Sequence, residues 1–171
     1  NTDKGYYLML GQLVAYKKAD LSVKAFNETG RKLVIIGEGE QFDELKKIAK
    51  TNVQLLGRQP FSVIKEHLSY CKALIFPGME DFGIVPVEAM ACGKPVIAYA
   101  KGGALETVID GKTGIHFTEQ TIESLNAAIE SFERSDAFDF VQIRAHAETF
   151  NKDIFKTKIT ASIHSVLENY S

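Results

Sequence analysis

Long apolar runs are missing from this sequence of 171 residues. No stretch approaches the ~20 consecutive apolar residues that a membrane-spanning helix needs. The first residues, Asn1 to Gly5, lack the basic region and the apolar stretch of a secretory signal peptide. These absences predict a cytoplasmic protein, with a peripheral position at the inner membrane face as the alternative. The sequence also lacks an initiator methionine, which predicts a domain taken from a longer chain.

Cysteine is scarce, and neither sign of charge dominates. Cys71 and Cys92 are the only cysteines, and neither has a partner at the spacing of a zinc site. We therefore expect reduced thiols, no metal site and no bound cofactor. Lysine and arginine number 20 against 22 aspartates and glutamates, which argues against a protein that grips nucleic acid by bulk positive charge.

The chain alternates between strand-like and helix-like patterns with short connections. Apolar runs that suit strands buried on both faces alternate with amphipathic stretches that suit helices. This order predicts one α/β domain over residues 1–171, a doubly wound Rossmann-like parallel sheet of about six strands with helices on both faces. The expected strands are Tyr6–Val14, Lys32–Ile36, Val53–Leu56, Ala73–Phe76, Pro95–Tyr99 and Gly114–Phe117. Ser62 and Thr121 are expected to cap two of the helices.

One segment, Pro77 to Ile97, is the most informative part of the sequence. It runs strand end, loop, helix, Gly-x-Pro and strand, and it carries Glu80 and Glu88 with seven residues between them. Either carboxylate alone is best interpreted as a solvated acid near a helix N-terminus. The whole string, however, resembles the Glu-x7-Glu signature of the retaining glycosyltransferases of family 4, which have two Rossmann-like domains facing across a cleft.

Other segments resemble this family in the same order along the chain. Gly11-Gln12-Leu13 with Lys17 resembles the motif of the first strand, except that Gln12 stands where the family usually has Arg. Gly37-Glu38-Gly39 resembles the turn after the second strand, and Gly57-Arg58 the loop that binds the base. Gly102-Gly103-Ala104-Leu105-Glu106 resembles the loop over the donor site.

The resemblance implies the C-terminal, donor-binding half of a GT-B fold that uses a nucleoside diphosphate sugar. Lys17 and Glu80 are the implied catalytic residues, with Lys17 on the diphosphate and Glu80 on the hexose. Glu88 is expected to face the same crevice and to bind the ribose, while N–H groups at the helix N-terminus bind phosphate. The implied substrate-binding residues are Gly11, Gln12, Gly37, Gly39, Arg58, Asp81, Phe82, Gly83, Ile84 and Glu88.

The motifs look most like those of bacterial or archaeal mannosyltransferases of polysaccharide assembly. GDP-mannose is therefore the first expected donor, and a UDP-hexose is the alternative. The acceptor, a glycan or a lipid-linked glycan, is expected to bind an N-terminal domain that this sequence does not contain. An apolar stripe on the last helix (Phe155, Ile159, Ile163, Val166 and Leu167) is expected to pack on that domain. We accordingly expect the isolated domain to be inactive.

Two other classes of function are weaker interpretations. A catalytically degraded nucleotide-binding module is favoured by Gln12 alone. A dinucleotide-dependent oxidoreductase is disfavoured, because the first strand is not followed by Gly-x-Gly-x-x-Gly at the start of a helix.

Overall fold

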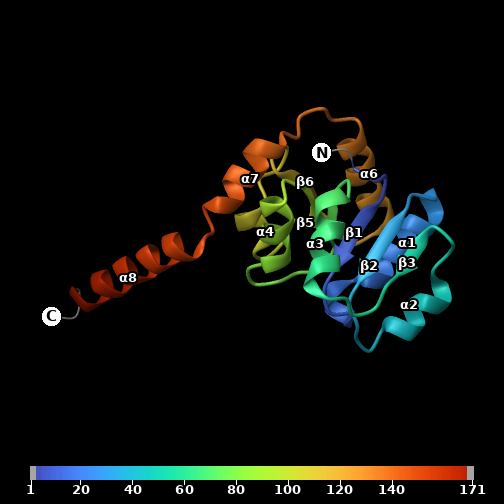
Figure 1. Cartoon of the computed structure of the whole chain (residues 1–171), viewed down its shortest axis with the longest axis horizontal. Coiled ribbons are helices and arrows are strands. Elements are labelled where there is room, and N and C mark those ends of the chain that lie inside the picture. Colours follow the sequence, from blue (N-terminus) through green and yellow to red (C-terminus); the bar gives the residue numbers. More distant parts are fainter. Residues whose placement is uncertain (1–2, 169–171) are drawn as a thin grey trace.

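A computed structural model describes residues 3–168 and contains a six-stranded parallel sheet with helices on both faces (Figure 1). The strand order is β3-β2-β1-β4-β5-β6, that of a doubly wound Rossmann-like domain, so the predicted fold class is confirmed. The strands are β1 (Tyr7–Leu10), β2 (Leu33–Ile36), β3 (Val53–Leu55), β4 (Leu74–Phe76), β5 (Val96–Tyr99) and β6 (Gly114–Phe117).

Helices cover the sheet on both sides because the central strands are apolar on both faces. Every residue of β2, β4 and β5 is buried. The helices are α1 (Ala19–Thr29), α2 (Phe42–Ile48), α3 (Phe61–Tyr70), α4 (Ile84–Ala91), α5 (Ala104–Thr107), α6 (Ile122–Glu133), α7 (Phe140–Glu148) and α8 (Lys152–Glu168), with a short 3-10 helix at Ala15–Lys17. Buried side chains of α1, α2 and α6 share one core cluster, and those of α3, α4 and α7 share the other.

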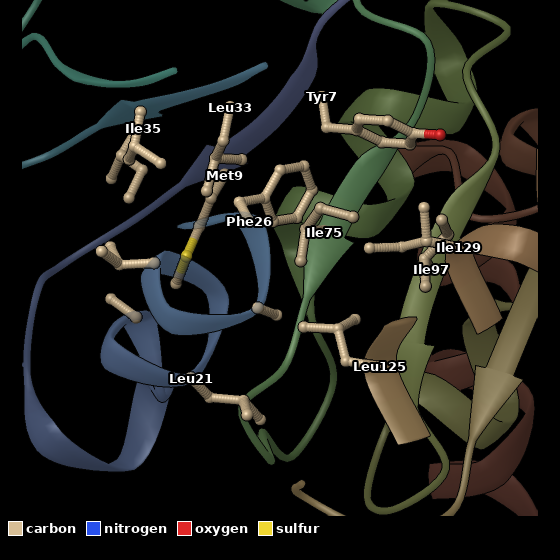
Figure 2. Close-up of a cluster of buried hydrophobic side chains, with 14 of the residues drawn as sticks. Tyr7, Met9, Leu21, Phe26, Leu33, Ile35, Ile75, Ile97, Leu125 and Ile129 are labelled. Atoms are coloured by element: carbon tan, nitrogen blue, oxygen red, sulfur yellow. The ribbon is translucent and has the colours of Figure 1, made fainter. Parts of the chain in front are cut away.

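The first of these clusters contains the largest aromatic side chains of the core (Figure 2). Tyr7 and Phe26 meet edge to face with their ring centroids 5.3 Å apart. The Tyr7 hydroxyl donates a hydrogen bond of 2.9 Å to Glu133 on α6, so its polar end is satisfied. Burying one such side chain contributes about 1.5–3 kcal/mol, which makes this cluster the main tie between β1 and the helices on its side.

Two expectations about local structure are wrong. The first strand ends at Leu10, because the chain turns away after Gly11 and forms the 3-10 helix instead of continuing to Val14. Ser62 does not cap α3; Pro60, with its fixed φ of −67°, precedes the helix, and the Pro60 carbonyl accepts from the N–H groups of Val63 and Ile64. The Thr121 cap is confirmed, since its Oγ1 accepts from the Ser124 N–H at 3.2 Å.

The last helix, α8, extends away from the body of the domain (Figure 1). Its predicted apolar stripe is exposed within this chain, with Phe155 at 62% and Ile163 at 53%. In the described part of the chain, no helix combines the length and the apolar character needed to cross a membrane.

Candidate functional site: a crevice at the carboxyl ends of the strands

The strand order fixes where a ligand crevice must lie. From β1 the chain moves outward to β2 and β3, and it then returns to place β4 on the other side of β1. The loops that follow β1 and β4 therefore diverge, and they leave a crevice at the carboxyl ends of these two strands. Most of the predicted site residues lie in these two loops and in the loops that follow β2 and β3.

Lys17 and Glu80 meet in this crevice. Lys17 ends the 3-10 helix after β1, and Glu80 lies in the loop between β4 and α4. The Lys17 ammonium donates a hydrogen bond to the Glu80 carboxylate, and both side chains are mostly buried, with exposures of 16% and 21%. The structure thus brings together the two residues predicted to be catalytic.

Glycines allow the loop that carries Glu80 to lie against its neighbours. A Cβ atom on Gly78 would come 2.8 Å from the Cα of Lys17, and one on Gly103 would come 2.4 Å from the Cα of Phe82. The Gly103 N–H also donates to the carbonyl of Glu80 at 2.7 Å. The loop is therefore held between the loop after β1 and the loop after β5 by contacts that a side chain would prevent.

Side chains from the C-terminal part of the domain support the same loop. Gln120 Nε2 donates to the Pro77 carbonyl at 2.8 Å. The Phe82 ring packs edge to face on Phe150, with centroids 5.8 Å apart, and Phe150 in turn contacts His146. Gln120 and Phe150 were not among the predicted site residues, since no local pattern shows that they reach a loop so distant in sequence.

The N-terminus of α4 opens toward the crevice. The helix starts at Ile84 after Gly83, whose φ of 81° suits glycine, and no side chain caps the first turn. The N–H groups of that turn thus remain available for an anion. A cavity of about 440 Å³ lies here, lined by Tyr16, Met79 and residues 80–85, and it includes the predicted residues Asp81, Phe82, Gly83 and Ile84.

A second cavity, of about 290 Å³, lies over the ends of β1, β2 and β3. Its lining includes the predicted residues Gly11, Gln12, Gly37 and Arg58. The Arg58 guanidinium is exposed and lies 3.6 Å from the Glu38 carboxylate, which also lines the cavity. A much smaller cavity lies between the two and shares Gly11 and Gln12 with this one and Glu80 with the other, so the three lie next to one another along the crevice.

Gly37 and Gly39 form the backbone floor beside this second cavity. A Cβ on Gly37 would lie 1.8 Å from the Gly11 carbonyl oxygen, and one on Gly39 would lie 2.5 Å from the Leu13 carbonyl oxygen. Only residues without a side chain allow the two turns to approach this closely. Gly39 itself does not line the cavity, so its contribution is to shape the turn.

Glu88 was expected to face the same crevice as Glu80. It is an exposed residue of α4 and lines none of the crevice cavities. Partial desolvation raises the pKa of its carboxyl. Its contact with a ribose stays a prediction.

No group of three or more His, Cys, Asp or Glu side chains that suits a metal ion occurs between residues 3 and 168. His67 and His146 instead meet structural partners, the Tyr6 hydroxyl and the Thr107 carbonyl. Within the described chain, the charged side chains that line the crevice are Lys17, Arg58, Glu38, Glu80 and Asp81.

This crevice agrees with what comparison with known proteins reveals. The sequence profile of the family described as "Glycosyl transferases group 1" matches residues 1–149. The chain belongs to this family. The chain is similar to an uncharacterized glycosyltransferase of Methanocaldococcus jannaschii, 36% identical over 118 residues, which cover 66% of this chain and 34% of the relative.

A second relative and a solved structure have more specific names. The GDP-mannose-dependent alpha-(1-6)-phosphatidylinositol monomannoside mannosyltransferase of Mycolicibacterium smegmatis is 30% identical over 145 residues, covering 74% of this chain and 38% of the relative. The crystal structure of Anabaena HepE in complex with UDP and glucose superposes with a TM-score of 0.80 at 23% identity, covering 95% of this chain and 49% of HepE. The chain thus spans about a third of the length of the curated relatives and half of the solved one.

Proposed function

We propose that the crevice binds a nucleoside diphosphate sugar and that this chain is the donor-binding part of a hexosyltransferase. The observation that carries the proposal is the position of Lys17, whose ammonium is hydrogen-bonded to Glu80 in the loop that leads to the uncapped N-terminus of α4. A diphosphate needs positive charge and N–H donors, whereas a hexose needs carboxylate acceptors for its hydroxyls. These two sets of groups are adjacent in the crevice.

Each group has a distinct role in the proposed reaction. The bond between the anomeric carbon and the diphosphate oxygen breaks, and negative charge develops on the leaving diphosphate. Lys17 and the N–H groups of the first turn of α4 stabilise that charge without a metal ion. Glu80 accepts from hexose hydroxyls, and Arg58 contacts the base in the second cavity. The anomeric carbon then bonds to the acceptor oxygen, and the proton of that hydroxyl passes to the leaving diphosphate, with retention of configuration as in the family that the motifs resemble.

The proposed donor is GDP-mannose. Support comes from the mycobacterial relative, whose name states dependence on GDP-mannose. A UDP-hexose is the second candidate, supported by the fold shared with HepE, whose structure holds UDP and glucose. The two candidates differ in the base, which the cavity around Gly37 and Arg58 would contact.

For the whole protein, we propose a second domain that binds the acceptor and packs on α8. The support is the exposed stripe of Phe155, Ile159, Ile163 and Val166, because apolar side chains gathered on one helix favour burial against a partner. In this proposal the chain alone binds the donor but does not transfer sugar to an acceptor.

Thermal unfolding with GDP, UDP and ADP at equal millimolar concentrations tests the donor site. A nucleotide at ten times its Kd stabilises the domain by about 1.4 kcal/mol, which raises the Tm by about 3 °C for a domain of this size. We expect the largest shift with GDP. Lys17→Met should abolish the shift, whereas Lys24→Met, which removes an exposed ammonium from α1, should leave it unchanged. Equal shifts in both variants, or none in the unmodified chain, would contradict the proposal.

A further inference from the structure

A separate cavity of about 370 Å³ lies near the amino ends of the strands, at the end of the sheet opposite the crevice. Three chain segments enclose it. They are the turn Gly93–Pro95 that leads into β5, the connection from the end of α6 to α7, and the approaches to β1 and β4 at Asp3 and Lys72. The first and third of these segments lead into the amino ends of β5, β1 and β4, whereas the donor crevice lies at the carboxyl ends of the strands.

Lys94 is the unusual residue of this cavity. It lines the cavity, yet the residue is only 6% exposed. Among residues 3–168 its ammonium has neither a hydrogen bond nor an ion pair. Its Nζ is not among the buried polar atoms that lack a partner, so the stem of the side chain is buried while the ammonium stays accessible to an anion in the cavity.

A second ammonium lies nearby. Lys72 also lines the cavity, and its Nζ lies 3.6 Å from a Glu133 carboxylate oxygen and 5.6 Å from the centre of the Tyr7 ring. Glu133 itself is held by Arg31 through two hydrogen bonds, of 2.7 and 3.0 Å. Lys72 is therefore only loosely paired with Glu133, and its ammonium can also interact with an anion in the cavity.

The remaining lining combines aromatic rings with hydrogen-bonding groups. The Phe140 ring lies against the backbone of Gly93, where a Cβ would come 1.9 Å from Cδ2 of the ring. Phe132 and Phe138 contact each other with centroids 5.2 Å apart and form another wall. Asp136 and Ser135 complete the lining with oxygen atoms that accept hydrogen bonds from hydroxyls.

We propose that this cavity is a second ligand site and that it takes a phosphorylated sugar. The two ammonium groups suit the phosphate, and the carboxylates of Asp3 and Asp136 suit hydroxyl groups. The same carboxylates would repel a ligand that was anionic along its whole length. The aromatic walls suit the C–H faces of a pyranose ring. A cavity of this volume lies within the range of small-molecule sites. The site is independent of the proposed donor crevice, because the two share no residue.

Isothermal titration of the whole 171-residue chain with mannose 6-phosphate, inorganic phosphate and mannose tests this proposal. We expect saturable binding of the sugar phosphate, weaker binding of phosphate and none of mannose. Lys94→Met should lower the affinity for the sugar phosphate at least tenfold. Lys112→Met is the matched control, since it removes an exposed lysine near the amino end of β6 and should leave the affinity unchanged. Lys17→Met, in the donor crevice, should also leave it unchanged.

A second measurement keeps the test independent of any loss of folding in Lys94→Met. Amide chemical shifts of the unmodified chain should change on addition of mannose 6-phosphate at Gly93, Ser135 and Phe140, and not at Gly37 or Gly83. Absence of saturable binding at 10 mM, unchanged affinity in Lys94→Met, or shift changes confined to the donor crevice would overturn the proposal.

Discussion

The ammonium of Lys17 is hydrogen-bonded to the carboxylate of Glu80, although the two residues are 63 positions apart in the sequence. This ion pair joins the loop after β1 to the loop after β4 across the crevice. Each group neutralises the other while no ligand is present. A diphosphate that reaches Lys17 must therefore compete with Glu80, and the released carboxylate becomes available for hydroxyl groups of the sugar.

This competition leads to a prediction for Glu80→Gln. The variant keeps the shape of the side chain but no longer holds Lys17 by charge, so GDP should bind at least as tightly as it does to the unmodified chain. GDP-mannose should lose its advantage over GDP, because a neutral amide accepts more weakly from sugar hydroxyls. Titration calorimetry with both ligands measures this difference. Glu123→Gln, an exposed acid in the first turn of α6, is the control and should change neither affinity.

The glycine contacts lead to a prediction for Gly103→Ala. The backbone conformation of Gly103, with φ of −61°, suits alanine, so the added methyl group acts only through its contacts with the backbone of Asp81 and Phe82. Overpacking of this kind costs about 1–3 kcal/mol of unfolding free energy. We expect a lower Tm and weaker GDP binding, because the loop that carries Glu80 must move. An unchanged affinity for GDP would show that the loop position does not matter for binding.

Gln12 offers a gain-of-function prediction. It is exposed and lines the crevice between the two larger cavities, where an added cation would lie near a bound diphosphate. Gln12→Arg should tighten GDP binding about tenfold, an amount typical of one charge-assisted hydrogen bond. The titration should show the same gain for UDP, since the diphosphate is common to both. No gain for either would mean that Gln12 is a working variant of this position.

The pH dependence of stability should reveal the ion pair between α6 and the chain before β2. Hydrogen bonds from the Arg31 guanidinium lower the pKa of Glu133, and the Tyr7 hydroxyl adds to this effect. A lowered pKa in the folded state stabilises the protein above the unfolded value near 4.5, and this stabilisation is lost as the pH falls through the folded pKa.

Glu133→Gln should therefore lower the unfolding free energy at pH 7 by about 1–3 kcal/mol. The difference from the unmodified chain should shrink as the pH falls below 4.5 toward the folded pKa. Urea unfolding at pH 7 and at pH 3.5 measures both effects. Glu130→Gln, whose partner Arg134 is 3.7 Å away and largely exposed, is the matched control on the same helix and should change stability little at either pH.

Much of the fold follows from local sequence features. The six strands lie where runs such as Leu33–Ile36 and Val96–Tyr99 are apolar on both faces, and their alternation with helices leaves few topologies. The two boundary errors have local physical causes. Gly11 ends the first strand by approaching Gly37, and Pro60 sets the start of α3 before Ser62 can cap it.

The donor crevice was predictable only in part, because some of its contacts join segments that are far apart in the sequence. The glycines and acids of the Glu80 loop stand in one continuous segment, so the sequence alone indicates them. The groups that hold this loop come from afar, namely Gln120, Phe150 and the backbone around Gly103. Such contacts depend on packing between distant segments, as does the burial of Lys94, and neither has a signal in the local pattern.

The projection of α8 from the domain has a hydrodynamic consequence. A compact chain of this length should have a radius of gyration of about 16 Å by the usual scaling. A helix of 17 residues that extends outward adds mass far from the centre, so small-angle scattering of the monomer should give a larger radius and a long tail in the distance distribution. A second domain or another copy of the chain that covers the exposed side chains of α8 would form a more compact complex. The scattering of that complex should lack the long tail.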